Sequence, residues 1–93
     1  MSYNSILKIV FNALKYLAQG SGEKEAIARS IKEARVQGRD ISRSAFKIFM
    51  EISKHRIRYD QLIHAIGDSN ISSSLRRIIY LFLYHAENYD CSE

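Results

Sequence analysis

The stretch that decides the fold is Leu75-Arg76-Arg77-Ile78-Ile79-Tyr80-Leu81-Phe82-Leu83-Tyr84-His85-Ala86. Its apolar residues recur every three or four positions, the spacing of one helical face: Leu75, Ile78, Ile79, Phe82, Leu83 and Ala86. Tyr80, Leu81 and Tyr84 fill much of the opposite face. Because a soluble helix that is apolar all round must be covered on several sides, the stretch predicts the central core helix of a bundle. It is too short to span a bilayer, which takes about 20 residues.

Four more helices are expected ahead of this one. Apolar residues at helical spacing predict them over 3–18, 23–37, about 40–55 and 59–66. Ser21 is the expected cap of the second helix, and Ser72 or Ser73 of the last. The first helix is expected to pack in the core; the alternative is a membrane-surface helix, but only two lysines lie on its polar side. We therefore expect one all-α domain over residues 1–93, a small bundle of about five helices with a frayed tail at 87–93.

The composition excludes several functional classes. A single cysteine among 93 residues rules out an internal disulfide and fits a reducing compartment, and no basic leader precedes the first apolar residues. We expect a cytoplasmic protein. The three histidines are far apart, and neither a Gly-rich phosphate loop nor a nucleophile elbow is present. No catalytic residue, metal, cofactor or small-molecule substrate is predicted, and the chain is not expected to be an enzyme by itself.

Positive charge is concentrated in the middle of the chain. The net charge is +4, and nine Lys/Arg stand against three acids between residues 29 and 58. Lys54, Arg56 and Arg58 form a basic elbow between two expected helices, and Arg76-Arg77 would join it if the loop at 67–70 folds back. Such a patch binds phosphates with salt-dependent affinity. A second basic stripe is either a solvated helix face or another phosphate contact: Arg29, Lys32 and Arg35.

Four segments follow one another in the order of a known helical family: Arg39-Asp40, then Ile48-Phe49 through Lys54 and Arg56, then Tyr59-Asp60-Gln61-Leu62-Ile63, then Leu75 through Tyr84. They resemble the NusB-like domain. In that family an Arg-Asp opens one helix, a basic turn leads to Leu-Asp-x-Leu-Leu, and the central helix reads Leu-Arg-x-Ile-Leu-x-Leu-x-Leu-Tyr. The resemblance covers roughly residues 5–86.

The resemblance implies an all-α bundle that binds RNA. The family occurs as a transcription antitermination factor, which binds a ribosomal RNA leader with a small ribosomal protein, and as the N-terminal domain of RNA cytosine-5 methyltransferases. Tyr3-Asn4-Ser5 stands where antitermination factors have an Arg-rich start, which favours the methyltransferase type. The implied RNA-binding residues are Arg39, Arg43, Lys54, Arg56, Arg58, Arg76 and Arg77.

The chain also departs from the family pattern. Glu51 and Phe82 stand where the family often has glycine, and Cys91 lacks the Pro-Cys context of a catalytic thiol. The sequence stops after the helix at 75–86, so it is either the N-terminal piece of a longer protein or a shortened stand-alone member. Apolar surface left uncovered would then mark a partner or homodimer interface, which we expect at Tyr80, Tyr84 and part of the first helix.

The resulting prediction is a non-catalytic helical module that binds RNA in RNA methylation or transcription antitermination. The alternative is a helical protein–protein adaptor or dimerisation module whose basic face only keeps it soluble. An enzyme fragment is a third reading. DNA binding also stays open, because Ser42, Arg43 and Ser44 near the start of the third expected helix resemble a weak recognition helix. No membrane partner is expected.

Overall fold

The computed structural model describes residues 2–35, 38–66 and 71–88. These residues form four α-helices and no strand: α1 (Ser2–Ala18), α2 (Glu23–Ala34), α3 (Arg39–Ile66) and α4 (Ser73–Asn88). The all-α prediction is therefore confirmed, whereas the number of helices is four in place of about five. None of these helices is long and apolar enough to cross a membrane. Of the tail expected to fray, Glu87 and Asn88 belong to α4, and 89–93 lie outside the described residues.

The two helices expected at about 40–55 and 59–66 are one continuous helix, α3, of 28 residues. No glycine or proline interrupts the sequence from Arg39 to Ile66. Ile52, Tyr59 and Ile63, at i, i+7 and i+11, are all at most 2% exposed and so keep one face buried through the segment that was expected to bend. The expected basic elbow is consequently part of one continuous helix.

The turn between α1 and α2 differs from expectation at its cap. Gly22 takes the N-cap position of α2, with no side-chain hydrogen bond, so Ser21 is not the cap. At its other end α2 stops at Ala34, three residues before the expected end, because Arg35 adopts the left-handed conformation (φ 54°) and its N–H bonds the Lys32 carbonyl. The cap of α4 follows the prediction: the Leu75 N–H donates to Ser72 Oγ at 3.2 Å.

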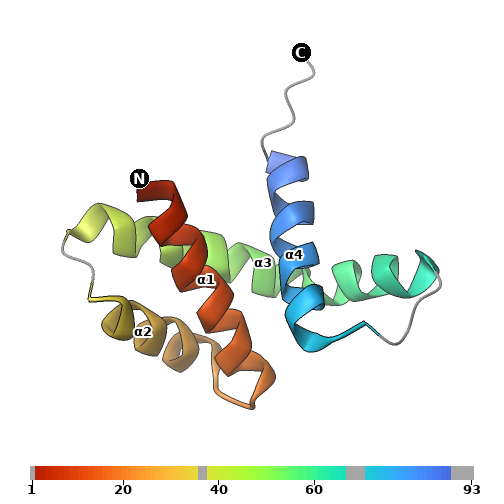
Figure 1. The fold of residues 1–93 in the computed structure, drawn as a ribbon, viewed down its shortest axis with the longest axis horizontal. Coiled ribbons are helices and arrows are strands. Elements are labelled where there is room, and N and C mark those ends of the chain that lie inside the picture. Colours follow the sequence, from red (N-terminus) through yellow and green to blue (C-terminus); the bar gives the residue numbers. More distant parts are fainter. Residues whose placement is uncertain (1, 36–37, 67–70, 89–93) are drawn as a thin grey trace.

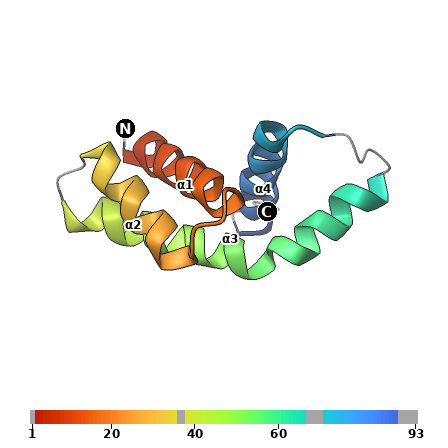
Figure 2. The same ribbon diagram turned by 90° about the horizontal axis from the view of Figure 1, so that it is seen from below.

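The four helices make a flat molecule. α1 and α2 lie over the N-terminal part of α3, and α4 crosses α3 near its middle (Figure 1). Seen along a perpendicular direction, α1 and α4 lie side by side on the same side of α3 (Figure 2). The extents are 41 × 38 × 19 Å, and the shortest of them corresponds to about two helix diameters. Only one layer of side chains can therefore be buried between the helices.

The core lies between α1, α2 and α3. The stripe expected on the first helix is buried, with Ile9, Val10 and Ala13 at most 1% exposed, and Phe49 of α3 is fully covered. Ser30 of α2 is the one polar side chain in the deepest part of this core, and it donates a 2.6 Å hydrogen bond to the Ile9 carbonyl. This bond ties α2 to α1 and satisfies a hydroxyl that would otherwise destabilise the core.

α4 is not the central core helix, which corrects the first prediction. Tyr80 and Tyr84 are its only side chains that are buried among those described, at 5% and 6% exposed. Leu75, Ile78 and Phe82 are 47%, 52% and 70% exposed. At about 100° per residue the two groups lie on opposite sides of the helix. α1 and α3, which each pack against all three other helices, form the centre of the molecule.

The tyrosine side of α4 is buried because α3 offers a carboxylate to each hydroxyl. Tyr80 donates to Asp60, and Tyr84 donates to Glu51 at 2.7 Å. Leucine and phenylalanine side chains cannot donate such hydrogen bonds. If the side of α4 that carries Leu75 and Phe82 packed against α3 instead, the carboxylates of Asp60 and Glu51 would face apolar atoms, which is costly.

Candidate nucleic-acid interface

The predicted basic residues fall into two groups and not on one continuous face. Arg56, Arg76 and Arg77 line a cavity of about 360 Å³ between α1, α3 and α4. Arg39 and Arg43 line a second, more open hollow at the start of α3, beside Phe46. Along α3, at 1.5 Å per residue, about 20 to 25 Å separates Arg43 and Arg39 from Arg56.

We call the first cavity the arginine cavity. Arg56 and Asp60 are one turn apart on α3, and the first turn of α4 supplies Ser73, Arg76 and Arg77. The last turn of α1 and Tyr80 complete it: Leu14, Leu17, Ala18 and Tyr80. The sequence analysis expected Arg76 and Arg77 to approach the basic residues at 54–58. Arg56 is the one that lines the same cavity, although α3 is continuous there.

Arg76 is held in place by a carboxylate. Its Nη1 lies 2.8 Å from Asp60 Oδ1, and the same oxygen accepts the Tyr80 hydroxyl. Burial, followed by the hydrogen bond to Asp60, raises the pKa of Tyr80 to about 12, so this hydroxyl stays protonated and donating at neutral pH. The pair fixes the Arg76 guanidinium and cancels its charge.

Arg77 has an unused donor. Its guanidinium carbon lies 4.6 Å from the centre of the Phe11 ring, a cation–π distance, and its Nη2 donates to Ser74 Oγ at 3.3 Å. Its Nε is buried and has no hydrogen-bond partner in the described part of the chain. Within 2–35, 38–66 and 71–88, no carboxylate forms an ion pair with Arg77 or Arg56. Because Asp60 offsets Arg76 alone, two positive charges of the arginine cavity have no counter-charge among the described residues.

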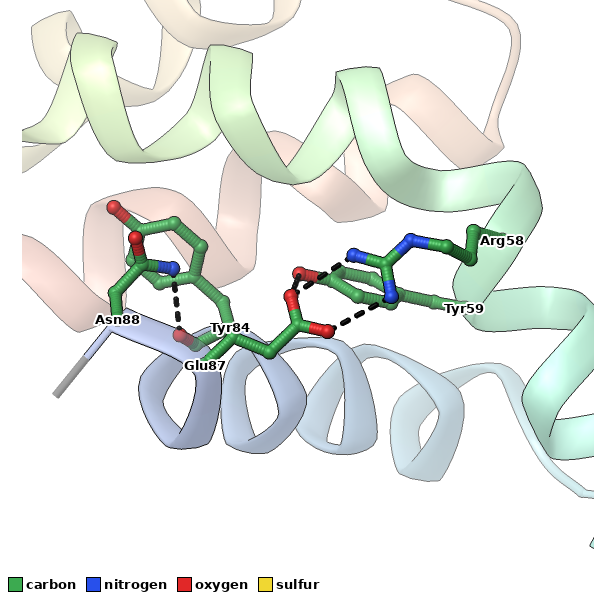
Figure 3. Close-up of polar contacts among 5 residues, drawn as sticks. All are labelled: Arg58, Tyr59, Tyr84, Glu87 and Asn88. Carbon is green, nitrogen blue, oxygen red and sulfur yellow. Dashed lines mark hydrogen bonds and ion pairs between the residues drawn. The ribbon is translucent and has the colours of Figure 1, made fainter. Parts of the chain in front are cut away.

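Arg58 has a different environment from the other predicted binding residues. Both of its terminal nitrogens bond the Glu87 carboxylate, at 2.8 and 2.9 Å, and the Tyr59 hydroxyl donates to the same carboxylate at 3.0 Å (Figure 3). The bond from Arg58 holds the pKa of Glu87 below its usual value. Arg58 therefore joins α3 to the end of α4. Lys54, one turn earlier, is exposed.

The second basic stripe lies on the outer surface of α2. Arg29 pairs with Glu33 at 3.4 Å and lies over the Tyr16 ring, whose hydroxyl also donates to Glu33. Lys32 and Arg35 are exposed, and none of the three basic residues lines either cavity. An exposed ion pair of this kind adds little to stability, so the stripe has the features of a solvated helix face.

Tyr80 and Tyr84 do not provide the surface that the sequence analysis expected of them, because both are buried against α3. The exposed apolar residues of α4 are Leu75, Ile78 and Phe82, which we call the outer face of α4. The sequence contained a signal for this surface, since α4 is apolar on two sides and a chain with so few other helices has little to cover both. It did not reveal which side.

In the described residues, no group of three His, Cys, Asp or Glu side chains is placed to hold a metal ion. No protein-family model, curated protein or solved structure matches the chain. The NusB-like resemblance therefore stays a prediction.

Proposed function

We propose that the chain is a non-catalytic RNA-binding module that holds RNA phosphates at the arginine cavity. The observation that carries the proposal is the convergence of Arg56, Arg76 and Arg77, from two helices, around one cavity with a single carboxylate. Two positive charges held close together attract an anion, and the positive end of the α4 dipole adds to their field.

The chemistry of the guanidinium group favours a phosphate over other anions. Its fork of N–H donors matches two phosphate oxygens at once. The Arg77 Nε needs an acceptor, and a phosphate oxygen supplies one. Arg76 is already oriented by Asp60, so little side-chain freedom is lost on binding.

The size and spacing of the basic groups favour a structured nucleic acid. A ligand that reaches both the arginine cavity and the hollow at Arg39 and Arg43 must extend at least about 20 Å along α3. Phosphate contacts read shape and not sequence, which suits the shape-based recognition that is usual for folded RNA. The preference for RNA over DNA, and the setting in RNA methylation or transcription antitermination, rest on the NusB-like resemblance.

The test is a fluorescence-anisotropy titration of a labelled RNA hairpin at about 50 and about 200 mM salt, where phosphate contacts differ strongly in strength. Arg56→Gln with Arg77→Gln should weaken binding at least tenfold at low salt. It should also reduce the slope of log affinity against log salt by about 1.5, because two counterion-releasing contacts are lost.

The matched control removes two charges from the solvated face of α2, as Lys32→Gln with Arg35→Gln, and should leave affinity within about twofold. Absence of RNA binding by the wild type at low salt would overturn the proposal, as would equal losses in the two double variants. Equal affinity for a DNA duplex of the same length would overturn the preference for RNA.

The adaptor alternative is favoured by one observation, the exposure of the outer face of α4. It predicts no salt-dependent RNA binding, and interactions that depend on Phe82 and not on Arg56 or Arg77. The same titration, repeated with Phe82→Ser, distinguishes the two functions.

A further inference from the structure

We propose that, within the RNA-binding function on which this inference rests, the arginine cavity holds the phosphate monoester at one end of an RNA strand, together with the nucleotide that carries it. Phosphates inside a strand are diesters with one negative charge each. A terminal monoester carries a charge of about −1.5 to −2 at neutral pH. The two kinds of phosphate differ in charge, in free oxygens and in what is attached to them, and the cavity fits the terminal kind in each respect.

The charge of the cavity matches a terminal phosphate. The charged side chains that line it are three arginines and one aspartate, which sum to +2. Asp60 is paired with Arg76 at 2.8 Å, so the excess charge belongs to Arg56 and Arg77, which form no ion pair among the described residues. A monoester cancels nearly all of this charge, whereas a diester leaves one arginine without a counter-charge.

The donors of the cavity also need more oxygens than a diester offers. Arg77 Nε is buried and has no hydrogen-bond partner in the described part of the chain, so only a ligand atom that enters the cavity can accept from it. Arg56 supplies a second guanidinium, with its own fork of donors. A diester has two oxygens that are not bonded to a sugar, and a terminal monoester has three. The monoester can therefore accept from Arg77 Nε and still present two oxygens to Arg56.

The size of the cavity fits one nucleotide and not a duplex. Its volume of about 360 Å³ is near the lower end of the range for small-molecule sites and equals that of a sphere about 9 Å across. Even the major groove of a DNA duplex is wider, at about 12 Å. α1 and α4 lie side by side on the same side of α3 (Figure 2), and all three helices line the cavity. With helices on three sides, the cavity suits the end of a strand better than a strand that must leave in both directions.

The lining of the cavity accounts for the nucleotide as well as for the phosphate. α1 contributes only apolar side chains to it, those of Leu14, Leu17 and Ala18. A bare phosphate ion gains nothing from apolar atoms, whereas the flat face of an unpaired base removes them from water. The ligand that uses both parts of the lining is therefore a phosphate with its nucleoside.

The hollow at Arg39 and Arg43 has the opposite character. Both of these arginines are exposed, whereas the three arginines of the cavity are half-buried. The hollow is also the more open of the two, so a continuous strand can pass over it. The RNA end would then lie in the arginine cavity, and internal phosphates would lie at Arg43 about 20 Å along α3.

The test compares one RNA hairpin in several chemical forms. The hairpin has a fluorescent label in its loop and unpaired overhangs of about three nucleotides, and it carries a 5′-phosphate, a 3′-phosphate or hydroxyl groups at both ends. Fluorescence anisotropy at about 50 mM salt gives each affinity for the wild type. At least one phosphorylated form should bind fivefold or more tightly than the hydroxyl form, and the form that gains identifies the end. Methyl esterification of that phosphate reduces its charge to −1 and should remove most of the gain.

Two double variants assign the gain to the cavity. Arg56→Gln with Arg77→Gln should abolish the difference between the phosphorylated and hydroxyl forms, and a difference that persists would place the terminal phosphate elsewhere. The matched control, Arg39→Gln with Arg43→Gln, also removes two charges. It should weaken both forms by the same factor and leave their ratio unchanged. The comparison of hairpins on the wild type does not depend on the folding of either variant.

The remaining outcomes separate this inference from the RNA-binding function. If all forms bind the wild type equally and with steep salt dependence, the cavity does not hold an RNA end, although RNA binding itself stands. If no form binds, the RNA-binding function fails as well. Free adenosine 5′-monophosphate should compete at least a hundredfold more weakly than the phosphorylated hairpin, because it cannot also reach Arg39 and Arg43. Equal affinity would assign the cavity to a free nucleotide and refute the assignment to an RNA end.

Discussion

Replacing Tyr84 and Phe82 by alanine, one at a time, tests which side of α4 is packed. Tyr84 is 6% exposed and donates to Glu51 at 2.7 Å. Truncating a buried aromatic side chain costs about 3–5 kcal/mol in the free energy of unfolding. Phe82 is 70% exposed, so its side chain gains only about a third of the 1.5–3 kcal/mol that full burial would contribute. Phe82→Ala should therefore lower the free energy of unfolding by about 0.5–1 kcal/mol.

The comparison is made by urea unfolding followed by far-UV circular dichroism, at the same low protein concentration for each variant. A domain of this size is stable by roughly 5–14 kcal/mol, so a loss of 3–5 kcal/mol is measurable without abolishing folding. The expected difference between the two alanine variants is about 2–4 kcal/mol.

Tyr84→Phe separates the hydroxyl from the ring. Because the hydroxyl donates to a carboxylate, its loss should cost about 1.5–3 kcal/mol, and the ring should account for the rest. Phe82→Ala could instead lower the free energy of unfolding as much as Tyr84→Ala does. In that case α4 packs through its leucine and phenylalanine side, and the reasoning from the tyrosine–carboxylate pairs is wrong.

Two further predictions concern pH and a turn. Alkaline unfolding is expected between about pH 10 and 12, since burial raises the pKa of Tyr59 and Tyr80 to about 12 in the folded state. Unfolded tyrosine titrates near 10, so the stability is complete below pH 10 and falls by about 1.4 kcal/mol per pH unit per tyrosine above it. Urea unfolding at several alkaline pH values checks this, and a flat stability up to pH 12 would contradict it. Gly20→Ser should destabilise by about 1 kcal/mol because Gly20 has φ +106°. Gly22→Ser should instead stabilise by a few tenths, since Gly22 is an N-cap in the extended conformation and lacks a side-chain bond. The expected outcome is that the melting temperature falls for Gly20→Ser and rises for Gly22→Ser. No atom lies within 4 Å of a Cβ added at either position, so steric clashes do not contribute to the difference.

Sequence periodicity predicted the helices that have one apolar side. α1 is the clearest case, because Ile6, Ile9, Val10 and Ala13 belong to one apolar stripe and all four are buried. The continuity of α3 was missed although the sequence contained a signal for it. Ile52 and Tyr59 are seven residues apart, with no glycine or proline between them, which is two helical turns.

The orientation of α4 could not be predicted from its own sequence. Both of its sides are apolar, and the side that packs against α3 is determined by Glu51 and Asp60. These residues lie on α3 and are 33 and 20 positions away in sequence from their tyrosine partners. A long-range contact of the same kind determines the environment of Arg58. Nothing in the local pattern indicates that Glu87 pairs with it.

The rotation of α4 about its own axis determines whether the arginine cavity forms. With Tyr80 and Tyr84 on α3, Arg76 reaches Asp60 and Arg77 lies against Phe11, so the arginine cavity forms. The same rotation directs Phe82 to solvent. A half-turn about the helix axis would take Arg76 away from Asp60, bury the outer face and remove the cavity. The stabilities of Tyr84→Ala and Phe82→Ala therefore also test the arrangement of side chains on which the proposed RNA-binding site depends.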